Sequence, residues 1–512
     1  MSEKLAFATA FSLVLAAGVS QGRDATWSGA VDGDPTKVEN WSGTTGCGSL
    51  DDRSNRDTAT FRGAPANTTI APSQEWIIGT LLFSDYGGQA AHWQLGSGNL
   101  VDPPIRLAGI DSGHLDFSHA AGVTDFVVDV VGPIVVANYY QFLCNSTEPS
   151  NVLKIGQIAG KGEMQLKGGG NRGVIYGPLG DGEGGTIAVN KMHKGTWTIK
   201  GNNTFTGIVT INEGTLIVSG DVDEAGKPGP LGANSSYTAG QGVRVGNQNP
   251  TADGFSALLL GYNDDGTPVI FARETTSLAN NKINTVDQKA HFGGANTNGV
   301  TKFTATVRSN RPSVLKCAAG GTVSFVGTFD PKGYAVAIGT EDFTGTVRFE
   351  SVPGTASGVT CAYGTLDMCA ELKAATTVES GAALTGSSAA NGKVTGALTV
   401  NAGGILAGTE GGLLQVKGDL ALAEGAVLRF PVAAREAPLV TVDSALSLKG
   451  VKVRLETPEV PPAGFIPLLT AAGGLTDADQ VDASELPKNY RVAVKGNTLC
   501  AKYSTGLVLL LR

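Results

Sequence analysis

The sequence predicts an all-β protein, a right-handed parallel β-helix with about 22 residues in each coil. One observation is a glycine that recurs in the same pattern at positions 381, 403 and 425, each 22 residues after the last. Such a period indicates a solenoid, because one coil cannot bury its apolar face alone and must stack on its neighbours. A second is the run of short alternating strands in residues 195–220. The right-handed coil is expected because connections between parallel strands of one sheet are almost always right-handed.

Residues 195–220 have the pattern of three short strands separated by turns. Trp197 and Ile199 alternate with polar residues, which is the period of a strand with one buried face. The Gly-Asn-Asn sequence at 201–203 is typical of a turn, since Gly and Asn tolerate a positive φ. Two further strands of the same kind follow within the segment.

This segment closely resembles the autotransporter-associated β-strand repeat, which is found in large secreted passenger proteins. Its motif is Gly-Asn-Asn-Thr-Phe-Thr-Gly followed by Asn-Glu-Gly-Thr-Leu, and it is specific. The residues that carry the resemblance are Trp197, Gly201, Asn202, Asn203, Phe205, Gly207, Gly214 and Leu216. The resemblance implies the architecture of a passenger, including the right-handed coil, and does not identify a ligand.

The second half of the repeat recurs further along the chain. Residues 378–384, 400–406 and 422–428 share an apolar residue, two small or polar residues, a glycine and a return to leucine. The glycines of these copies are Gly381, Gly403 and Gly425. We expect them at the corners of the coils, where glycine reaches the required backbone geometry most easily.

The chain divides into four parts. Its first residues have a short n-region with one lysine, an apolar run from Leu5 to Val19 and small residues for cleavage, which together predict a secretory signal peptide. The predicted parts are a signal peptide (1–22), a Trp-rich N-terminal β capping module (23–150), the β-helix (151–450) and a C-terminal cap (451–512). A final strand is expected at 506–511.

The N-terminal module holds four of the five tryptophans. They are Trp27, Trp41, Trp76 and Trp93. Aromatic side chains at the start of a solenoid would cover the open end of the stack, where strand edges are otherwise unpaired. The alternative is a sugar-stacking site on exposed Trp faces.

The length of the segment after the last clear repeat indicates whether a C-terminal membrane barrel follows the repeats. Fewer than ninety residues follow that repeat, so we expect the fold of a passenger without the C-terminal membrane barrel. After residue 22 no apolar run has the ~18 residues of a transmembrane helix. The sequence therefore predicts a secreted or cell-surface protein with no transmembrane anchor of its own.

The six cysteines are scattered through the chain with no Cys-x-x-Cys pair. They are Cys47, Cys144, Cys317, Cys361, Cys369 and Cys500. An exported chain permits disulfides, and Cys361 with Cys369 is the pair that eight residues would join across one corner. The alternative is that the cysteines are small buried core residues.

Candidates for chemistry are few. Asp111, His114, Asp116 and His119 form the one acid–imidazole cluster, in which His114, Asp116 and Ser118 would share one face of a strand. A half-buried strand with polar residues outward explains the same pattern.

An acidic turn offers the other candidate. Asp32, Asp34 and Glu39 have oxygens that would suit calcium, although ordinary turn chemistry explains them as well. No cofactor or metal is expected.

Composition narrows the function classes. Charged residues are 16% of the chain and the net charge is −8 without a concentrated run, which argues against nucleic-acid binding. Enzymes that cleave polysaccharides on this fold need paired carboxylates or Asp with Lys or Arg, but residues 394–416 hold one acid, Glu410, and no Lys or Arg. We expect a non-enzymatic structural or adhesin-like protein whose partners are surface glycans or cell-surface proteins. The alternative is a polysaccharide-binding or polysaccharide-degrading β-helix.

Overall fold

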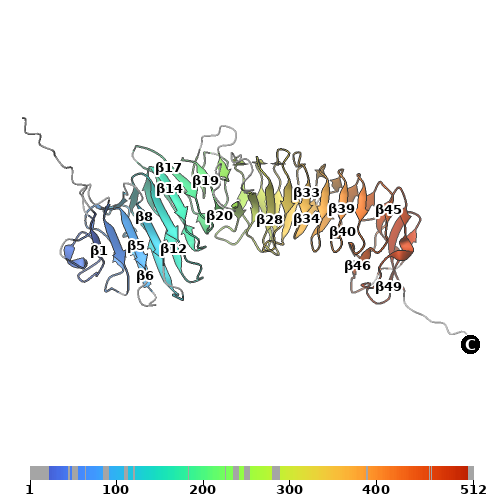
Figure 1. Ribbon diagram of the computed structural model, residues 1–512, viewed down its shortest axis with the longest axis horizontal. Coiled ribbons are helices and arrows are strands. Elements are labelled where there is room, and N and C mark those ends of the chain that lie inside the picture. The colour runs from blue at the N-terminus through green and yellow to red at the C-terminus, as the bar shows by residue number, and fades with distance from the viewer. Residues whose placement is uncertain are drawn as a thin grey trace, which may run out of the picture.

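The chain folds into a rod of stacked β-strands that runs from the N-terminal to the C-terminal end (Figure 1). The computed structural model describes residues 22–43, 46–48, 56–63, 65–84, 91–108, 113–118, 122–182, 184–224, 226–234, 242–246, 254–278, 289–387, 390–460, 462 and 464–504. These residues contain no α-helix and two 3-10 helices, η1 (Val38–Asn40) and η3 (Ala478–Gln480). The predicted all-β class is confirmed. The predicted signal peptide, apart from Gly22, and the final strand at 506–511 lie outside the described residues.

Successive coils place their strands on three faces of the rod, and each strand pairs in parallel with its counterpart in the next coil. This pairing is that of a parallel β-helix, so the predicted architecture is confirmed. We number the faces in the order in which the chain visits them within a coil.

The first face is a 5-stranded sheet followed by a 9-stranded sheet. The shorter sheet contains β4 (Trp76–Ile78), β7 (Ile105–Leu107), β10 (Ile134–Val136), β13 (Ile158–Gly160) and β16 (Leu179–Asp181). The longer one contains β23 (Ile270–Phe271), β26 (Val300–Phe303), β29 (Thr322–Phe325), β32 (Thr346–Phe349), β34 (Thr365–Met368), β37 (Ala383–Gly386), β40 (Ile405–Ala407), β43 (Val427–Pro431) and β46 (Lys452–Glu456).

The second face is a 12-stranded sheet followed by a 7-stranded sheet. The first of these contains β1 (Asp24–Thr26), β2 (Thr58–Phe61), β5 (Thr80–Ser84), β8 (His114–Ser118), β11 (Tyr140–Cys144), β14 (Gly162–Lys167), β17 (Ile187–Lys191), β19 (Val209–Ile211), β21 (Val243–Val245), β24 (Thr275–Ser277), β27 (Val307–Arg308) and β30 (Phe329–Asp330). The other contains β35 (Glu371–Leu372), β38 (Gly392–Val394), β41 (Leu414–Val416), β44 (Val440–Val442), β47 (Phe465–Ala471), β50 (Thr498–Tyr503) and β49 (Tyr490–Lys495).

The third face is a 15-stranded sheet followed by a 2-stranded sheet. The larger sheet contains β3 (Thr69–Ile70), β6 (Ala91–Leu95), β9 (Phe126–Val130), β12 (Val152–Ile155), β15 (Gly173–Ile175), β18 (Thr196–Lys200), β20 (Gly214–Ser219), β22 (Ser256–Leu260), β25 (Ala290–Gly294), β28 (Ser313–Cys317), β31 (Val336–Ile338), β33 (Val359–Cys361), β36 (Thr376–Val378), β39 (Leu398–Val400) and β42 (Leu420–Leu422). The pair is β45 (Leu446–Ser447) and β48 (Leu475–Thr476).

Coil length matches the predicted period where the repeats are clearest. Ala383 pairs with Ile405 and Ile405 with Val427, which are 22 residues apart in each case. Elsewhere the length varies, and Ile105 and Ile134, which pair on the first face, are 29 residues apart. Loops at the corners absorb the difference, because strand register fixes only the residues inside the strands.

The repeat glycines lie at one corner of the rod. The φ angles of Gly381, Gly403 and Gly425 are 80°, 75° and 85°, a left-handed conformation that glycine adopts readily. The Gly381 amide donates to the Gly403 carbonyl, and the Gly403 amide donates to the Gly425 carbonyl, both at 2.9 Å. The corner is therefore tied along the axis by backbone hydrogen bonds as well as by the strands beside it.

Strand pairing continues across the predicted domain boundaries at 150 and 450. On the third face β12 pairs with β9 on one side of residue 150 and with β15 beyond it, and on the first face β43 pairs with β46 across residue 450. The Trp-rich segment therefore forms the first coils of the same stack. The stack changes only at its end, where β50 pairs antiparallel with β47 and β49.

Candidate functional site

The apolar residues of the predicted repeat build the core. The side chains of Trp197, Phe205 and Leu216 are fully buried. The indole of Trp197 donates to the Lys167 carbonyl at 3.0 Å, which satisfies its one polar group.

Asn203 joins three successive coils through its side chain. Its Oδ1 accepts from the Leu179 amide at 2.8 Å, and its Nδ2 donates to the carbonyls of Lys200 and Pro230 at 3.2 and 2.8 Å. The neighbouring Asn202 is exposed. The second asparagine of the motif is therefore the one whose side chain links the coils by hydrogen bonds.

The glycines of the repeat serve close backbone contacts. Gly201 and Gly214 have φ angles of 82° and 75°. A Cβ at Gly207 would lie 2.1 Å from the Ile187 carbonyl oxygen, so no side chain fits there. Together with the core residues, these positions have structural roles and form no binding surface.

The four N-terminal tryptophans are buried, so the sugar-stacking alternative is wrong for them. Trp27, Trp41, Trp76 and Trp93 are at most 4% exposed. The Trp27 and Trp41 rings meet edge to face at 5.1 Å. The indoles of Trp27, Trp41 and Trp76 donate to backbone carbonyls. The rings are turned inward because they fill the first coils, and they present no free aromatic face.

The acid–imidazole cluster lies along β8. His114, Asp116 and Ser118 share the outer face of this strand, while Leu115 and Phe117 are buried between them. The Ser118 hydroxyl donates to the Asp116 carboxylate. Asp111 and His119 lie outside the described residues. The arrangement is that of a half-buried strand with polar residues outward.

The acidic turn is held together by its own hydrogen bonds. Asp32 accepts from the Lys37 ammonium, which together with backbone donation lowers the pKa of Asp32 to about 2. The Asp34 carboxylate accepts from the amide and hydroxyl of Thr36 at 3.0 and 2.7 Å. Glu39 is exposed. Across the described ranges, no three His, Cys, Asp or Glu side chains are grouped so that they would hold a metal ion.

The predicted disulfide between Cys361 and Cys369 is not formed, and both thiols are free. Cys361 ends β33 on the third face and its side chain is fully buried, while Cys369 follows β34 on the first face and is half-buried. The two residues thus end strands of different faces. Burial raises the pKa of Cys361 to about 12, which makes it an unreactive core residue.

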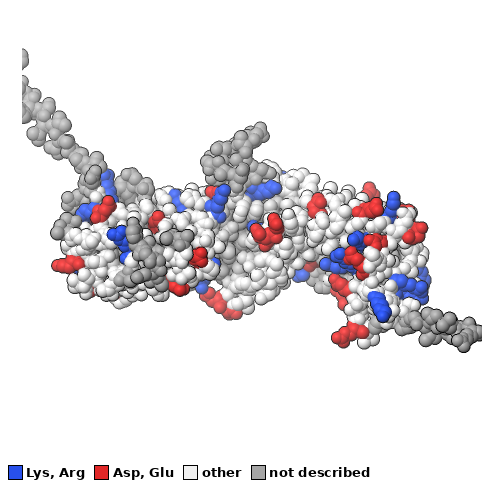
Figure 2. Space-filling model, turned by 60° about the horizontal axis from the view of Figure 1, so that its bottom comes forward, with Lys and Arg blue, Asp and Glu red and all other residues white. Residues whose placement is uncertain are grey.

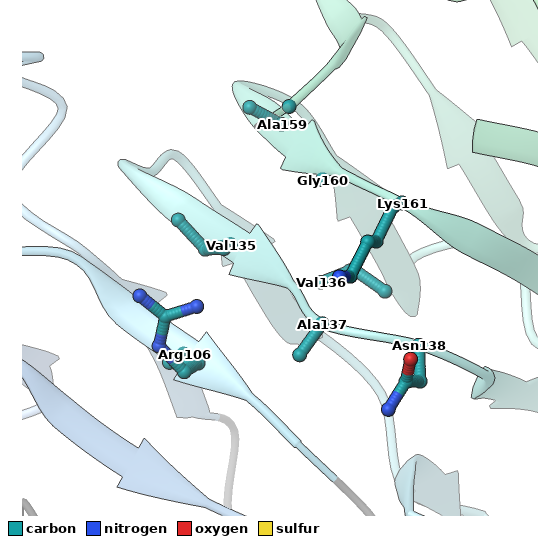
Figure 3. Close-up of a pocket in the computed structure, with 9 residues that line it drawn as sticks. Arg106, Val135, Val136, Ala137, Asn138, Ala159, Gly160 and Lys161 are labelled. Atoms are coloured by element: carbon teal, nitrogen blue, oxygen red, sulfur yellow. The ribbon is translucent and has the colours of Figure 1, made fainter. Parts of the chain in front are cut away.

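A surface hollow lies on the outer side of the five-stranded sheet, and we call it the Arg106 groove (Figure 3). Its volume is about 550 Å³. The floor consists of Val135 on β10, Ala137 directly after it, and Ala159 and Gly160 on β13, whose small size leaves room above the sheet. The residues beyond the floor are Arg106, Asn138, Lys161 and Gly182.

Two cations border this groove from different strands. Arg106 lies on β7 and donates through Nε to Glu75 Oε1 at 2.7 Å, so its charge is largely compensated. Lys161 follows β13 and is exposed. A carboxylate in the groove would therefore meet one compensated guanidinium and one ammonium, and the described residues that line the hollow include no Asp or Glu.

The second face carries a row of polar side chains beside this region. Gln141, Gln165, Asn190 and Thr210 stand opposite one another on four successive strands. Lys167 donates to Gln141 Oε1 at 3.0 Å. Gln165 is buried in this row, and its amide accepts from the Tyr139 hydroxyl and donates to Glu163, so the row is held by hydrogen bonds among its own neighbours.

One ammonium is buried inside the rod. Lys191 faces the core on β17 and donates to the carbonyls of Met192, His193 and Glu213 at 2.8, 2.7 and 3.0 Å. Burial lowers the pKa of Lys191 to about 7. It has no contact with solvent, so its role is in stability.

The sequence pattern did not single out the residues of the groove. Arg106 sits at an outward position of an ordinary alternating strand, and Lys161 stands between Gly160 and Gly162, so the Gly-Lys-Ser/Thr ending of a phosphate-binding loop is absent there. A groove of this kind depends on small residues in adjacent coils, which become neighbours only after coils of unequal length are aligned. The described residues include no helix of the length and hydropathy that would cross a membrane.

Comparisons of the chain with protein-family models, with curated proteins and with solved structures give no match.

Proposed function

We propose that this protein is a non-enzymatic, exported rod that serves as a structural or adhesin-like component at the cell surface or outside the cell. The observation that carries the proposal is the long parallel stack, in which one sheet of the third face alone has 15 strands. Repeats of this kind create extended binding surfaces. The resemblance to passenger repeats and the predicted signal peptide support the location.

The positions of the polar residues also support a structural role. Among the described candidates, Ser118 and Asp116 are hydrogen-bonded to each other on β8, and Asp32 and Asp34 accept hydrogen bonds within their own turn. Figure 2 shows a face on which neutral residues predominate between the ends of the rod. At the C-terminal end Lys452 pairs with Glu485 at 3.3 Å, and such exposed pairs contribute little to stability.

A polysaccharide-binding role is the second candidate, and the Arg106 groove favours it. The groove is elongated across adjacent strands, is bordered by cations and has a floor of small side chains. These features suit the docking of a chain molecule more than the cleavage of one, because hydrolysis requires two placed carboxylates.

The proposal is tested in the cells that produce the protein. An antibody against the rod should detect it on intact cells, protease treatment of those cells should remove the signal, and deletion of the gene should reduce attachment to surfaces. The purified chain should release neither reducing nor unsaturated ends from a panel of polysaccharides. A protein protected from protease in intact cells would contradict export, and product release would contradict the non-enzymatic role.

A further inference from the structure

A second hollow lies on the outer side of the third face, and we call it the Tyr176 hollow. Its volume is about 390 Å³, and it is lined by Asp129, Val152, Lys154, Val174, Tyr176 and Lys200. These residues come from the neighbouring strands β9, β12, β15 and β18 or from the residue directly after a strand. The two valines make an apolar floor, and the polar groups surround it.

Tyr176 lies across the sheet because a glycine makes room for it. A Cβ at Gly156 would lie 2.5 and 2.6 Å from Cε2 and Cζ of the Tyr176 ring, so the ring rests directly on the Gly156 backbone. The ring reaches over β12 to β9, where its hydroxyl donates to Asp129 Oδ1 at 2.7 Å. The side chain is half-buried. One side of the ring is therefore packed on backbone, and the rest is open to the hollow.

The hydroxyl hydrogen bond fixes the ring in this position. Burial, together with the Asp129 carboxylate, raises the pKa of Tyr176, so the phenol stays protonated and continues to donate. The Asp129 carboxylate is thereby engaged at one oxygen. An aromatic ring fixed in advance loses little conformational entropy when a ligand packs on it.

Two ammonium groups flank the ring. Lys154 lies on β12, directly opposite Asp129 on β9 and Val174 on β15, which places it beside the apolar floor. Lys200 ends β18, the strand next to β15, and its ammonium lies 2.9 Å from Asp264. Asp264 is 83% exposed, so this pair is weak and is readily exchanged for another carboxylate.

We propose that the Tyr176 hollow binds an acidic sugar unit of a polysaccharide, a uronate. The C–H face of the pyranose ring packs on the open side of the Tyr176 ring and on Val152 and Val174. The sugar carboxylate accepts hydrogen bonds from Lys154 and Lys200. The ring hydroxyls exchange hydrogen bonds with the free oxygen of Asp129.

The size and charge of the hollow favour this ligand class. A volume of about 390 Å³ admits one or two sugar rings and leaves the rest of a chain outside. An apolar floor, an aromatic ring and a few well-positioned polar groups are typical of a site for a small ligand. The two flanking cations discriminate in favour of an acidic sugar over a neutral one. The inference rests on the proposed function in one respect: a protein outside the cell encounters polysaccharides that contain uronates.

The test uses the purified chain and affinity electrophoresis in gels containing polygalacturonate, alginate or neutral dextran. The wild type should be retarded by at least one of the two uronate polymers and not by dextran. Tyr176→Ala should weaken the retardation about tenfold, Tyr176→Phe should retain most of it, and Lys154→Gln should weaken it and reduce its salt dependence. Melting temperatures should show that all variants are folded.

Two matched controls lie elsewhere on the rod. Tyr363→Ala removes a tyrosine that is 43% exposed, and Lys449→Gln removes an exposed ammonium that lines neither hollow. Both should leave retardation unchanged. Equal retardation of wild type and Tyr176→Ala, equal retardation by dextran, or no retardation by either uronate polymer would each overturn the inference. Because the assay uses purified protein, its result is independent of where the cell places the rod.

Discussion

The side chain of Asn203 makes hydrogen bonds to backbone groups at a corner of the rod, where strands do not supply them. Its amide meets backbone groups 24 residues before it and 27 residues after it. Because this corner lies outside the strands, the Leu179 amide and the Pro230 carbonyl depend on the Asn203 side chain as their partner. A buried donor or acceptor that loses its partner costs about 1–3 kcal/mol.

Replacing Asn203 should therefore destabilise the rod. In Asn203→Ala the Leu179 amide and the Pro230 carbonyl lose their partner, and we expect a loss of about 2–4 kcal/mol in the unfolding free energy. Urea unfolding followed by circular dichroism measures it. Asn202→Ala is the control, since Asn202 is exposed and should change stability by less than about 0.5 kcal/mol. Equal effects of the two variants would contradict the role given to Asn203.

The corner glycines give a second prediction at this scale. Gly403 has a φ of 75°, and a Cβ there would lie 2.4 Å from Ser380 Oγ. Gly403→Val should lower the unfolding free energy by about 2 kcal/mol or more, with a clear fall in melting temperature. Calorimetry measures this, and Gly169→Ala serves as control because a Cβ at Gly169 meets nothing within 4 Å. An unchanged melting temperature of Gly403→Val would count against a tight corner.

The buried ammonium of Lys191 links stability to pH. Its pKa falls from 10.5 in the unfolded chain to about 7 in the folded one, so the unfolded state binds more protons between these values. Stability should therefore rise as pH increases from 7 toward 10.5 and should show no dependence on this group below 7. In urea unfolding, the increase in unfolding free energy from pH 7 to pH 9.5 should be larger for the wild type than for Lys191→Met. Parallel pH profiles of the two proteins would refute the assignment.

At the scale of elements, the strands of one face are joined inside the rod by stacked aromatic rings. Phe303 and Phe325 pair in register on β26 and β29, and their rings stack at 5.1 Å. The Phe349 ring continues the column 5.7 Å from Phe325. Because coils of unequal length share this column, the core keeps register while the corners vary.

Removal of the middle ring tests this column. Phe325→Ala should lower the unfolding free energy by about 3–5 kcal/mol, because both neighbouring rings lose a partner and a cavity forms. Phe325→Leu keeps most of the volume and should cost less. Denaturant unfolding of the two variants measures the difference, and an Ala variant no less stable than the Leu variant would contradict close packing there.

The elements also show what the sequence predicts and what it does not. The period near residues 381–425 follows from strict spacing, since each coil there has the same length and the glycine always meets the same corner. The continuity of the stack through residue 150 was missed because coils such as those of Ile105 and Ile134 have loops that hide the period. The Tyr176 hollow was missed for a related reason: Gly156 and Tyr176 become neighbours only when two coils are aligned.

Over the whole molecule, each coil contacts mainly the coils beside it. Stability in such a stack is close to a sum of coil and interface contributions, so different parts can open separately. At one end of the described stack lie the antiparallel strands β47, β50 and β49, and at the other lie the tryptophans of the first coils.

Local opening is a prediction at this scale. In Gly403→Val, hydrogen exchange should accelerate in the coils near residue 403, such as β37, β40 and β43, and remain unchanged in distant strands such as β5. Hydrogen-exchange mass spectrometry measures both regions in one experiment. Uniform acceleration along the rod would show that it unfolds as one cooperative unit.

The axial direction of the hydrogen bonds has a mechanical consequence. Tension applied between the two ends acts on one interface between coils after another, as on links in series, and the weakest link opens first. A coil of 22 residues, such as the one between Gly381 and Gly403, then releases roughly 70 Å of extended chain in place of roughly 5 Å of rod. Under such a load the rod would lengthen in steps of about one coil.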